Sequence, residues 1–210
     1  MKKIFFVILL IFVSCNAFSQ FAFGIAANYT TSLGFDENWT FDADRLKFKN
    51  DPAHGFSAGI FLRAGKRFFV QPELTYNFMI SAAILEQDSV VAKKRKIYLN
   101  TINLPVLVGG KVVDTKIFNM RVMFGPRFRF DVGSKNEGED AITTTTRKWQ
   151  LGLETGIGFD LWRITIDARY NLMQDIFSYN YSANELKFSP INSFTFGIGV
   201  KLVDIIPKKK

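Results

Sequence analysis

The sequence predicts an all-β protein, an eight-stranded antiparallel up-and-down transmembrane β-barrel, and three observations carry this prediction. Eight segments alternate apolar and polar residues with the period of two that places successive side chains on opposite faces of a strand. One face of each predicted strand carries no Asp, Glu, Lys or Arg. The connections between the segments alternate long and short, as in outer-membrane barrels, whose periplasmic turns are short.

The segment 118–132 shows the two faces most clearly. One set of alternate positions is wholly apolar, and the other carries three arginines and an aspartate. In a soluble sandwich the apolar set would form the core, whereas in a membrane barrel it faces lipid and the charged set faces inward. A charge on the lipid face at the bilayer midplane costs roughly 2–4 kcal/mol, which explains why the apolar faces carry none.

The chain of 210 residues is long enough for one sizeable domain and begins with a predicted signal peptide over residues 1–19. Lys2 and Lys3 precede the apolar run 4–13, and small residues follow it, which is typical of a secretory leader. The run is too short to span a bilayer as a helix. The only cysteine, Cys15, lies in this leader and is expected to be lost with it; the alternative is a lipoprotein cysteine acylated after cleavage at Ser14.

The predicted barrel occupies residues 20–203, and a basic C-terminal tail occupies residues 204–210. We expect long polar connections over 31–52, 80–96, 133–146 and 174–190, and short turns at 64–66, 109–116 and 160–161. Eight strands place both termini on the periplasmic side. The expected strands span residues 21–29, 55–62, 67–78, 97–108, 118–132, 149–160, 162–172 and 193–202.

Each strand is justified by its alternation. The first sets Phe, Ile and Tyr against Ala, Gly and Asn, and the second sets Phe, Ile and Leu against Ser, Gly and Arg. The third and fourth set aromatic and aliphatic residues against polar ones, and the fifth is the segment 118–132. The sixth sets Trp and Leu against Gln, Gly and Glu; the seventh opposes Ile and Tyr to Arg, Asp and Asn; the eighth opposes Phe, Ile and Val to Gly, Ser and Lys.

Three prolines conflict with this pattern. Pro72, Pro105 and Pro126 fall inside the third, fourth and fifth strands, although proline cannot donate to a β-ladder and a closed barrel has no edge to hold it. We therefore expect β-bulges at these prolines, with the three close together on neighbouring strands.

Two groups of residues are the candidate functional ones. Trp and Tyr at strand ends favour the head-group levels of a membrane and predict an aromatic girdle: Tyr29, Tyr76, Tyr98, Trp149, Trp162 and Tyr170. The charged inward positions predict an interior network: Arg63, Arg67, Glu73, Arg121, Arg127, Arg129, Asp131, Glu154, Asp160, Arg163, Asp167, Arg169 and Lys201.

We interpret the interior network as structural, because the interior of an eight-stranded barrel is filled by side chains and a buried charge without a partner is costly. The alternative is a narrow ion path or a small-ligand site. Inward glycines are expected to make room for the long arginines.

Enzyme and metal motifs are sparse. The only histidine, His54, has Ser57 and Glu73 as conceivable partners for a lipid deacylase, but nothing in the sequence places them within reach. Acidic residues of the first long connection, Asp36, Glu37, Asp42 and Asp44, could bind calcium, but a solvated loop is the preferred explanation. We therefore expect no enzymatic activity and no cofactor.

The net charge of +8 falls to +6 once Lys2 and Lys3 leave with the leader, and three of the remaining charges form the tail. The basic residues are dispersed rather than interleaved with aromatic residues on one surface, so the sequence gives no sign of nucleic-acid binding.

Short motifs in the third to fifth strands resemble the PorT-type outer-membrane β-barrel family. They are Gln71-Pro72-Glu73-Leu74, Leu104-Pro105-Val106-Leu107 and Phe124-Gly125-Pro126, joined by Asp167-Ala168-Arg169-Tyr170-Asn171 in the seventh strand. The resemblance covers most of the chain after the leader and implies an outer-membrane barrel without catalytic residues. It also implies a link to protein secretion, because the family's named member takes part in a secretion system.

The sequence thus predicts a monomeric, non-enzymatic barrel in the outer membrane of a Gram-negative bacterium, in contact with lipid and binding another envelope or secretion protein. Two alternatives are a narrow channel or small-ligand binding barrel, and a soluble periplasmic carrier whose charges face out.

Overall fold

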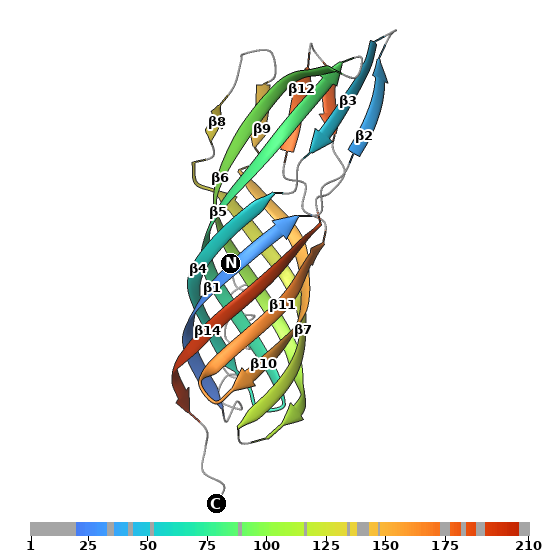
Figure 1. Cartoon of the computed structure of the whole chain (residues 1–210). Helices are drawn as coiled ribbons and strands as arrows, with labels where there is room; N and C mark the ends of the chain where they lie inside the picture. The colour runs from blue at the N-terminus through green and yellow to red at the C-terminus, as the bar shows by residue number, and fades with distance from the viewer. Residues whose placement is uncertain are drawn as a thin grey trace, which may run out of the picture.

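Eight strands form a closed antiparallel barrel in which each strand pairs with the next and the last pairs with the first (Figure 1). The computed structural model describes residues 20–32, 36–41, 44–50, 53–87, 90–115, 117–133, 135–137, 143–146, 148–172, 177–181, 184–187 and 192–205. The barrel strands are β1 (Phe21–Ser32), β4 (His54–Ala64), β5 (Phe68–Gln87), β6 (Val90–Asp114), β7 (Phe118–Asp131), β10 (Trp149–Leu161), β11 (Ile164–Leu172) and β14 (Ser193–Ile205). The predicted fold class is confirmed.

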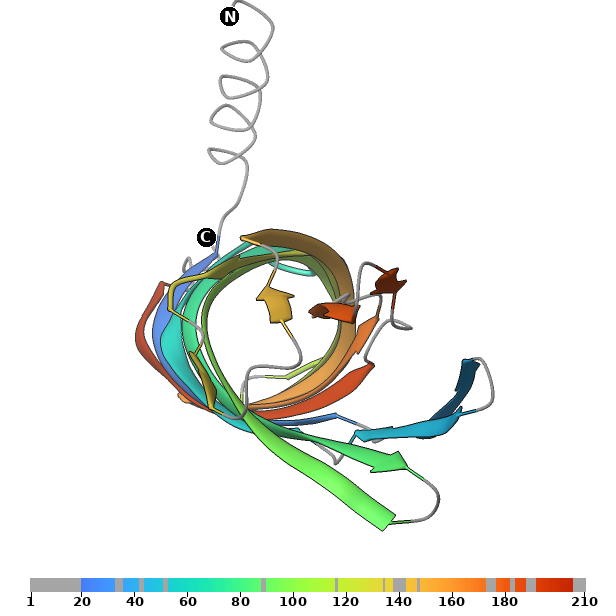
Figure 2. The same cartoon turned by 90° about the horizontal axis from the view of Figure 1, so that it is seen from above.

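The described parts of the long connections contain strands, where the sequence predicted irregular loops. β5 and β6 continue past the barrel as a long hairpin, and β3 pairs with the far end of β5 from Leu46↔Gln87 to Asn50↔Ala83 (Figure 2). Charged residues gave these segments the appearance of loops, although they also alternate with apolar ones. The strands outside the barrel are β2 (Asp36–Phe41), β3 (Asp44–Asn50), β8 (Lys135–Glu137), β9 (Thr143–Thr146), β12 (Phe177–Tyr181) and β13 (Asn184–Lys187).

The two faces of the barrel strands have the predicted orientation. On β7, Arg121 is fully buried, whereas Phe124 is 64% exposed on the outer face. Phe69, Leu107 and Met123 form a small apolar cluster inside the barrel, which shows that the interior is not wholly polar. No helix among the described residues is long and apolar enough to cross a bilayer.

The prolines are accommodated without the predicted bulges. Pro72 pairs with Val106, and Pro105 pairs with Arg127, so the three prolines do lie on neighbouring strands within one or two residues of each other. Some residue pairs next to the prolines are not hydrogen-bonded in the β-ladders, but the register is the same on both sides of each proline. The register shifts of the barrel ladders fall elsewhere, at 23/24, 85/86 and 111/113. The prediction of bulges at the prolines was wrong.

Several strand boundaries also differ from the prediction. The tight turn between β10 and β11 is Trp162-Arg163, not residues 160–161, and Leu161 pairs with Ile164 across it. Trp162 has φ of 53°, the left-handed conformation that a two-residue hairpin turn requires. β6 extends to Asp114 through the expected turn 109–116, and β14 extends to Ile205 into the expected tail. The leader and residues 206–210 lie outside the described residues.

Candidate functional site

The interior of the barrel gathers most of the charged residues that the sequence predicted to face inward. Asp131 is half-buried at the loop end of β7. Arg67 and Arg163 are exposed instead, because they lie in the turns before β5 and before β11, and the Arg163 guanidinium lies 5.4 Å from the centre of the Trp162 ring. The buried members are Arg63, Glu73, Arg121, Arg127, Arg129, Glu154, Asp160, Asp167, Arg169 and Lys201.

Asp160 is the centre of the layer nearest the short turns. Its carboxylate accepts a hydrogen bond from Arg63 Nη1 at 2.7 Å, forms an ion pair with Lys201 Nζ at 3.2 Å and also pairs with Arg121. Asp160 is only 1% exposed, so these interactions are formed away from water. A single buried carboxylate thus joins cations from β4, β7 and β14.

Arg169 is the centre of the next layer. Its Nη1 donates to Glu73 Oε2 and its Nη2 to Glu73 Oε1, both at 2.8 Å, which is the bidentate geometry that makes Arg–carboxylate pairs strong. The same guanidinium donates to Glu154 at 2.9 Å and to Asp167 at 2.7 Å. Asp167 also pairs with Arg121, so the two layers form one continuous network.

Two of these ion pairs cross the full width of the barrel. β4 and β10 lie four strands apart in the eight-stranded ring, as do β5 and β11, so each pair of strands is diametrically opposed. The Arg63–Asp160 pair joins the first two strands, and the Glu73–Arg169 pair joins the second two. The lumen is therefore bridged by side chains at two levels.

Uncharged residues complete the network, and the sequence analysis passed over them. Gln71 accepts from Arg63 Nε and donates to Glu73, both at 2.6 Å, and thereby connects the two bridging pairs. Asn171 accepts from Arg127 Nη1 at 2.6 Å and donates to Ser193 and Thr195. Their inward register was visible in the alternation, but a search limited to charged residues could not find them.

Lys111 was also missed, because it was assigned to a turn. It faces the interior near the end of β6, where its Nζ donates to Gln20 at 2.9 Å and pairs with Asp114 at 3.4 Å.

Two inward glycines provide the space that the arginines occupy, as predicted. A Cβ atom at Gly158 would lie 2.5 Å from Arg121 Cζ and would also meet the Asp167 carboxylate, and one at Gly156 would lie 2.8 Å from Arg169 Cγ. At other inward glycines the neighbour is different; Gly24 faces the Phe61 ring, for example.

Replacing Gly158 with alanine is therefore expected to lower the free energy of unfolding by about 1–3 kcal/mol, the usual range for overpacking a dense interior. The added methyl group would displace the guanidinium that joins Asp160 to Asp167. The measurement is urea unfolding of the refolded protein in lipid vesicles. Gly110→Ala is the control, because the nearest atom to its added Cβ would lie at 3.5 Å, an ordinary contact; equal losses in the two variants would contradict this account.

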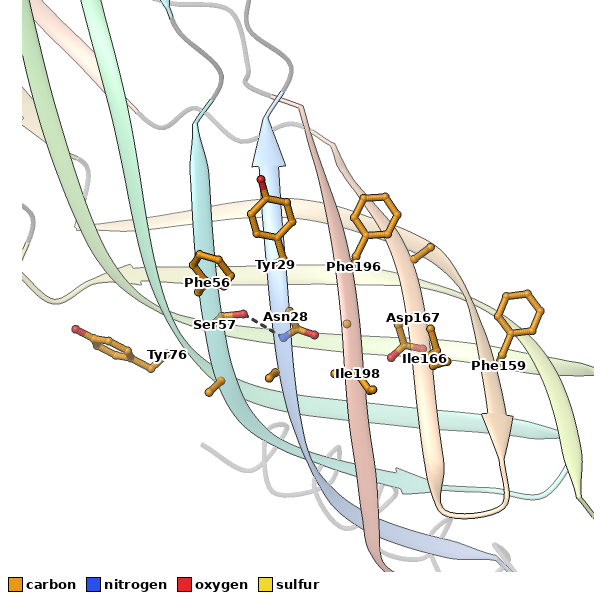
Figure 3. Close-up of a pocket in the computed structure, with 14 residues that line it drawn as sticks. Asn28, Tyr29, Phe56, Ser57, Tyr76, Phe159, Ile166, Asp167, Phe196 and Ile198 are labelled. Carbon is orange, nitrogen blue, oxygen red and sulfur yellow. Dashed lines mark hydrogen bonds between the residues drawn. The ribbon is translucent and has the colours of Figure 1, made fainter.

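The outer wall carries an apolar depression of about 750 Å³ over β4, β1, β14 and β11 (Figure 3). Small residues form its floor, and the rings of Tyr29, Phe56 and Phe196 stand around it. The Asn28 amide behind it donates to Ser57 Oγ at 3.0 Å across β1 and β4. This depression offers hydrocarbon contact and little polar chemistry.

The predicted girdle residues lie at varied positions. Trp162 is exposed in the short turn, and Trp149 is exposed at the start of β10 beside a long connection. Tyr76 donates to Asn100 at 3.2 Å, and the Tyr98 and Tyr170 rings pack against Phe78 and Phe194, respectively. Tyr29 contacts His54. The assignment of these residues to a membrane girdle stays a prediction.

The conceivable deacylase residues do not meet. His54 Nδ1 contacts the Tyr29 hydroxyl at 2.6 Å, Ser57 is bonded to Asn28, and Glu73 is held by Arg169 and Gln71. No group of three metal-binding side chains is found in the described part of the chain. Of the four acidic residues considered for calcium, Asp42 lies outside the described residues, and the other three lie in β2 and β3.

A sequence model of the family described as "Outer membrane protein beta-barrel domain" matches residues 16–172. Among solved structures, OprG from Pseudomonas aeruginosa has a TM-score of 0.57 at 13% identity, covering 88% of this chain and 96% of OprG. The Yersinia pestis attachment invasion locus protein Ail, crystallised with the heparin analogue sucrose octasulfate, has a TM-score of 0.43 at 10% identity, covering 87% and 99%. No curated protein matches the sequence significantly. The likeness to OprG supports the fold alone.

Proposed function

Because the chain belongs to the outer membrane protein β-barrel domain family, we propose that it is a non-enzymatic component of the Gram-negative cell envelope that binds a partner outside its lumen. The outer membrane location and the contact with lipid follow from the family and from the apolar outer wall. The partner-binding role is the new element, and the observation that carries it is the double bridging of the lumen.

The bridged lumen argues against transport as the main activity. Arg63–Asp160 and Glu73–Arg169 each span the barrel, and Gln71 ties one pair to the other. A permeating ion would have to displace carboxylates that are at most 5% exposed and hold two or three donors each. Buried groups of this kind are costly to separate, so the interior acts as a plug.

The strands that extend beyond the barrel supply a surface for binding a partner, which the bridged lumen does not. The β5–β6 hairpin continues past the barrel, β2 and β3 extend the same sheet, and β8 pairs with β6 over Lys96–Tyr98 (Figures 1 and 2). A second small sheet, formed by β9, β12 and β13, lies at the same end. Ordered strands on the long-connection side are suited to recognising another protein by their edges and faces.

The finer assignment is an accessory role in secretion or envelope integrity, as a PorT-type barrel. It is supported by the motifs around Pro72, Pro105 and Pro126, which the fold brings together on β5, β6 and β7. In this proposal the short turns and both termini lie on the periplasmic side, and the extended strands face outward.

The channel alternative is tested by planar-bilayer conductance. We expect no discrete conductance from the wild-type protein, because two ion pairs bridge its lumen. The double variant Glu73→Ala/Arg169→Ala removes one bridge without leaving a lone charge from that pair, and it is expected to raise the ionic current. Robust wild-type current that the double variant does not alter would contradict the plug.

The partner role is tested by replacing residues 81–97 with a short Asn-Gly turn, since Ile80 and Tyr98 are already cross-strand neighbours. We expect this variant to insert and to migrate as a heat-modifiable barrel, but to lose the protein that crosslinks to the wild type in intact envelopes. The matched control places the same Asn-Gly turn at the opposite end of the barrel, in place of Trp162 and Arg163, and should retain the crosslink. Loss of the crosslink in the control alone would place the partner on the other side of the membrane.

A further inference from the structure

The interior changes in chemistry toward the end that carries the long connections. Past Arg127, the inward positions of β5, β6 and β7 carry amides and hydroxyls with one more arginine among them, and the buried apolar pair Met79 and Leu99 lies beyond these polar residues. The polar residues are all buried: Thr75, Asn77, Thr101, Asn103 and Arg129. Arg129 is 5% exposed, so its charge is removed from water to the same degree as the charges of the ion-pair network.

Arg129 is bonded differently from the other buried arginines. Each of the others forms an ion pair with a buried carboxylate. Arg129 Nε donates to Asn103 Oδ1 at a long 3.4 Å, and its Nη1 has no hydrogen-bond partner among the described residues. Asp131 contributes charge from the strand end, where its Oδ1 accepts from the Gly133 N–H at 3.3 Å. Arg63, Arg121, Arg127 and Arg169 also have one N–H without an acceptor, but each of them has a carboxylate within ion-pair distance. Among the buried arginines that the structure describes, Arg129 alone combines an unpaired N–H with no such carboxylate, and this combination points to a missing ligand.

Two asparagine amides lie near the Arg129 guanidinium and add further hydrogen-bond donors. Asn103 is the cross-strand neighbour of Arg129, and its Nδ2 likewise has no hydrogen-bond partner in the part of the chain that the structure describes. Asn77 is the cross-strand neighbour of Thr101; its Nδ2 lies a weak 3.5 Å from Thr101 Oγ1, and its Oδ1 is unpartnered. If the Asn77 amide turns over, the Thr101 hydroxyl can donate to Oδ1 and the NH₂ group is released. Arg129, Asn103 and Asn77 then carry three N–H donors without acceptors on the neighbouring strands β7, β6 and β5.

We propose that Arg129, Asn103 and Asn77 form a binding site for a small oxyanion of the carboxylate, sulfate or phosphate class, which is a function separate from partner binding. A water molecule would satisfy one donor without giving the guanidinium an anionic partner at ion-pair distance, whereas an oxyanion supplies both the acceptors and the negative charge. The ion enters from the end with the long connections, because the two bridging ion pairs close the path from the other end.

The test is thermal unfolding of the refolded protein in a zwitterionic detergent, in inorganic phosphate or in chloride at equal ionic strength. A ligand that binds only the folded state raises the melting temperature in a saturable manner. We expect phosphate to raise it and chloride to have little effect, with acetate as a second oxyanion probe. Arg129→Gln and Asn103→Leu are each expected to weaken the apparent affinity about tenfold or more, because each removes a hydrogen-bond donor to the buried ion.

Arg163→Gln is the matched control, because it removes the same charge from an exposed turn at the opposite end. It should keep the full phosphate response. Equal melting of the wild type in phosphate and chloride would mean that water alone satisfies these donors and would overturn the site, as would an unchanged response in Arg129→Gln. Should Arg129→Gln fail to fold, Asn103→Leu keeps the arginine and decides the question. These outcomes are independent of whether a partner crosslinks.

Discussion

Asp160→Asn is expected to lower the free energy of unfolding by about 3–5 kcal/mol, the cost of removing one partner from a buried ion pair. The change keeps the shape of the side chain and removes only its charge. Arg63 and Lys201 would lose the buried carboxylate that they share, and Arg121 would retain Asp167 alone. The expected loss is large because Asp160 is 1% exposed and pairs with three cations, of which Lys201 would keep only its longer pair with Asp204 at 3.5 Å.

The measurement is urea unfolding in lipid vesicles, followed by tryptophan fluorescence and by heat-modifiable migration. Asp114→Asn is the control, because the Asp114 side chain is 41% exposed and its pair with Lys111 is long at 3.4 Å. Such a pair is expected to contribute less than about 1 kcal/mol. Equal losses in the two carboxamide variants would show that the bridged network does not stabilise the barrel.

A double-mutant cycle separates the Arg63–Asp160 pair from general damage. If the pair is the cause, Arg63→Gln combined with Asp160→Asn should cost less than the sum of the two single changes, because neither charge is then left alone. Strict additivity would mean that Asp160 acts through its other two partners. Either outcome assigns the energy to particular cations.

Much of the barrel could be predicted because a period of two is a local signal. The orientation of 118–131 follows from its own residues, and eight such segments with alternating connections leave few architectures. The same reliance on a local signal led to the strands outside the barrel being missed. A segment such as Arg45-Leu46-Lys47-Phe48-Lys49 also alternates, but its high charge makes it resemble a solvated loop. The pairing of β3 depends on the far end of β5, which is distant in the sequence.

The network could be predicted as a set of residues but not as a set of bonds. Alternation indicates that Glu73 and Arg169 face inward, but only the closed ring of strands shows that they lie opposite each other. Arg67 and Arg163 were wrongly included because both keep the inward phase of their strands, yet the chain turns at those residues and releases them to the surface. Phase alone cannot show where a strand ends.

Ile198→Arg is expected to destabilise the membrane-inserted protein by about 2–4 kcal/mol, because it places a charge on the lipid face near the middle of a strand. Ile198 is 58% exposed on the outer wall of β14 and lines the apolar depression there. The polar groups that line this depression are already hydrogen-bonded, so they offer the new guanidinium no free partner. The measurement is urea unfolding in vesicles, with the yield of heat-modifiable barrel as a second readout.

Ile205→Arg isolates the depth of the charge as the cause. Ile205 is an isoleucine on the same strand with the same 58% exposure, but it pairs with Phe21 at the end of the barrel. At that level the long arginine side chain can extend to the head groups, so the cost should fall to about 0–1 kcal/mol. If the outer wall faced water instead of lipid, both substitutions would add a charge to a solvent-exposed position, and both would leave the free energy of unfolding nearly unchanged. A large difference between them therefore measures the hydrocarbon around the barrel, whereas equal and small effects would contradict the outward orientation of the apolar face.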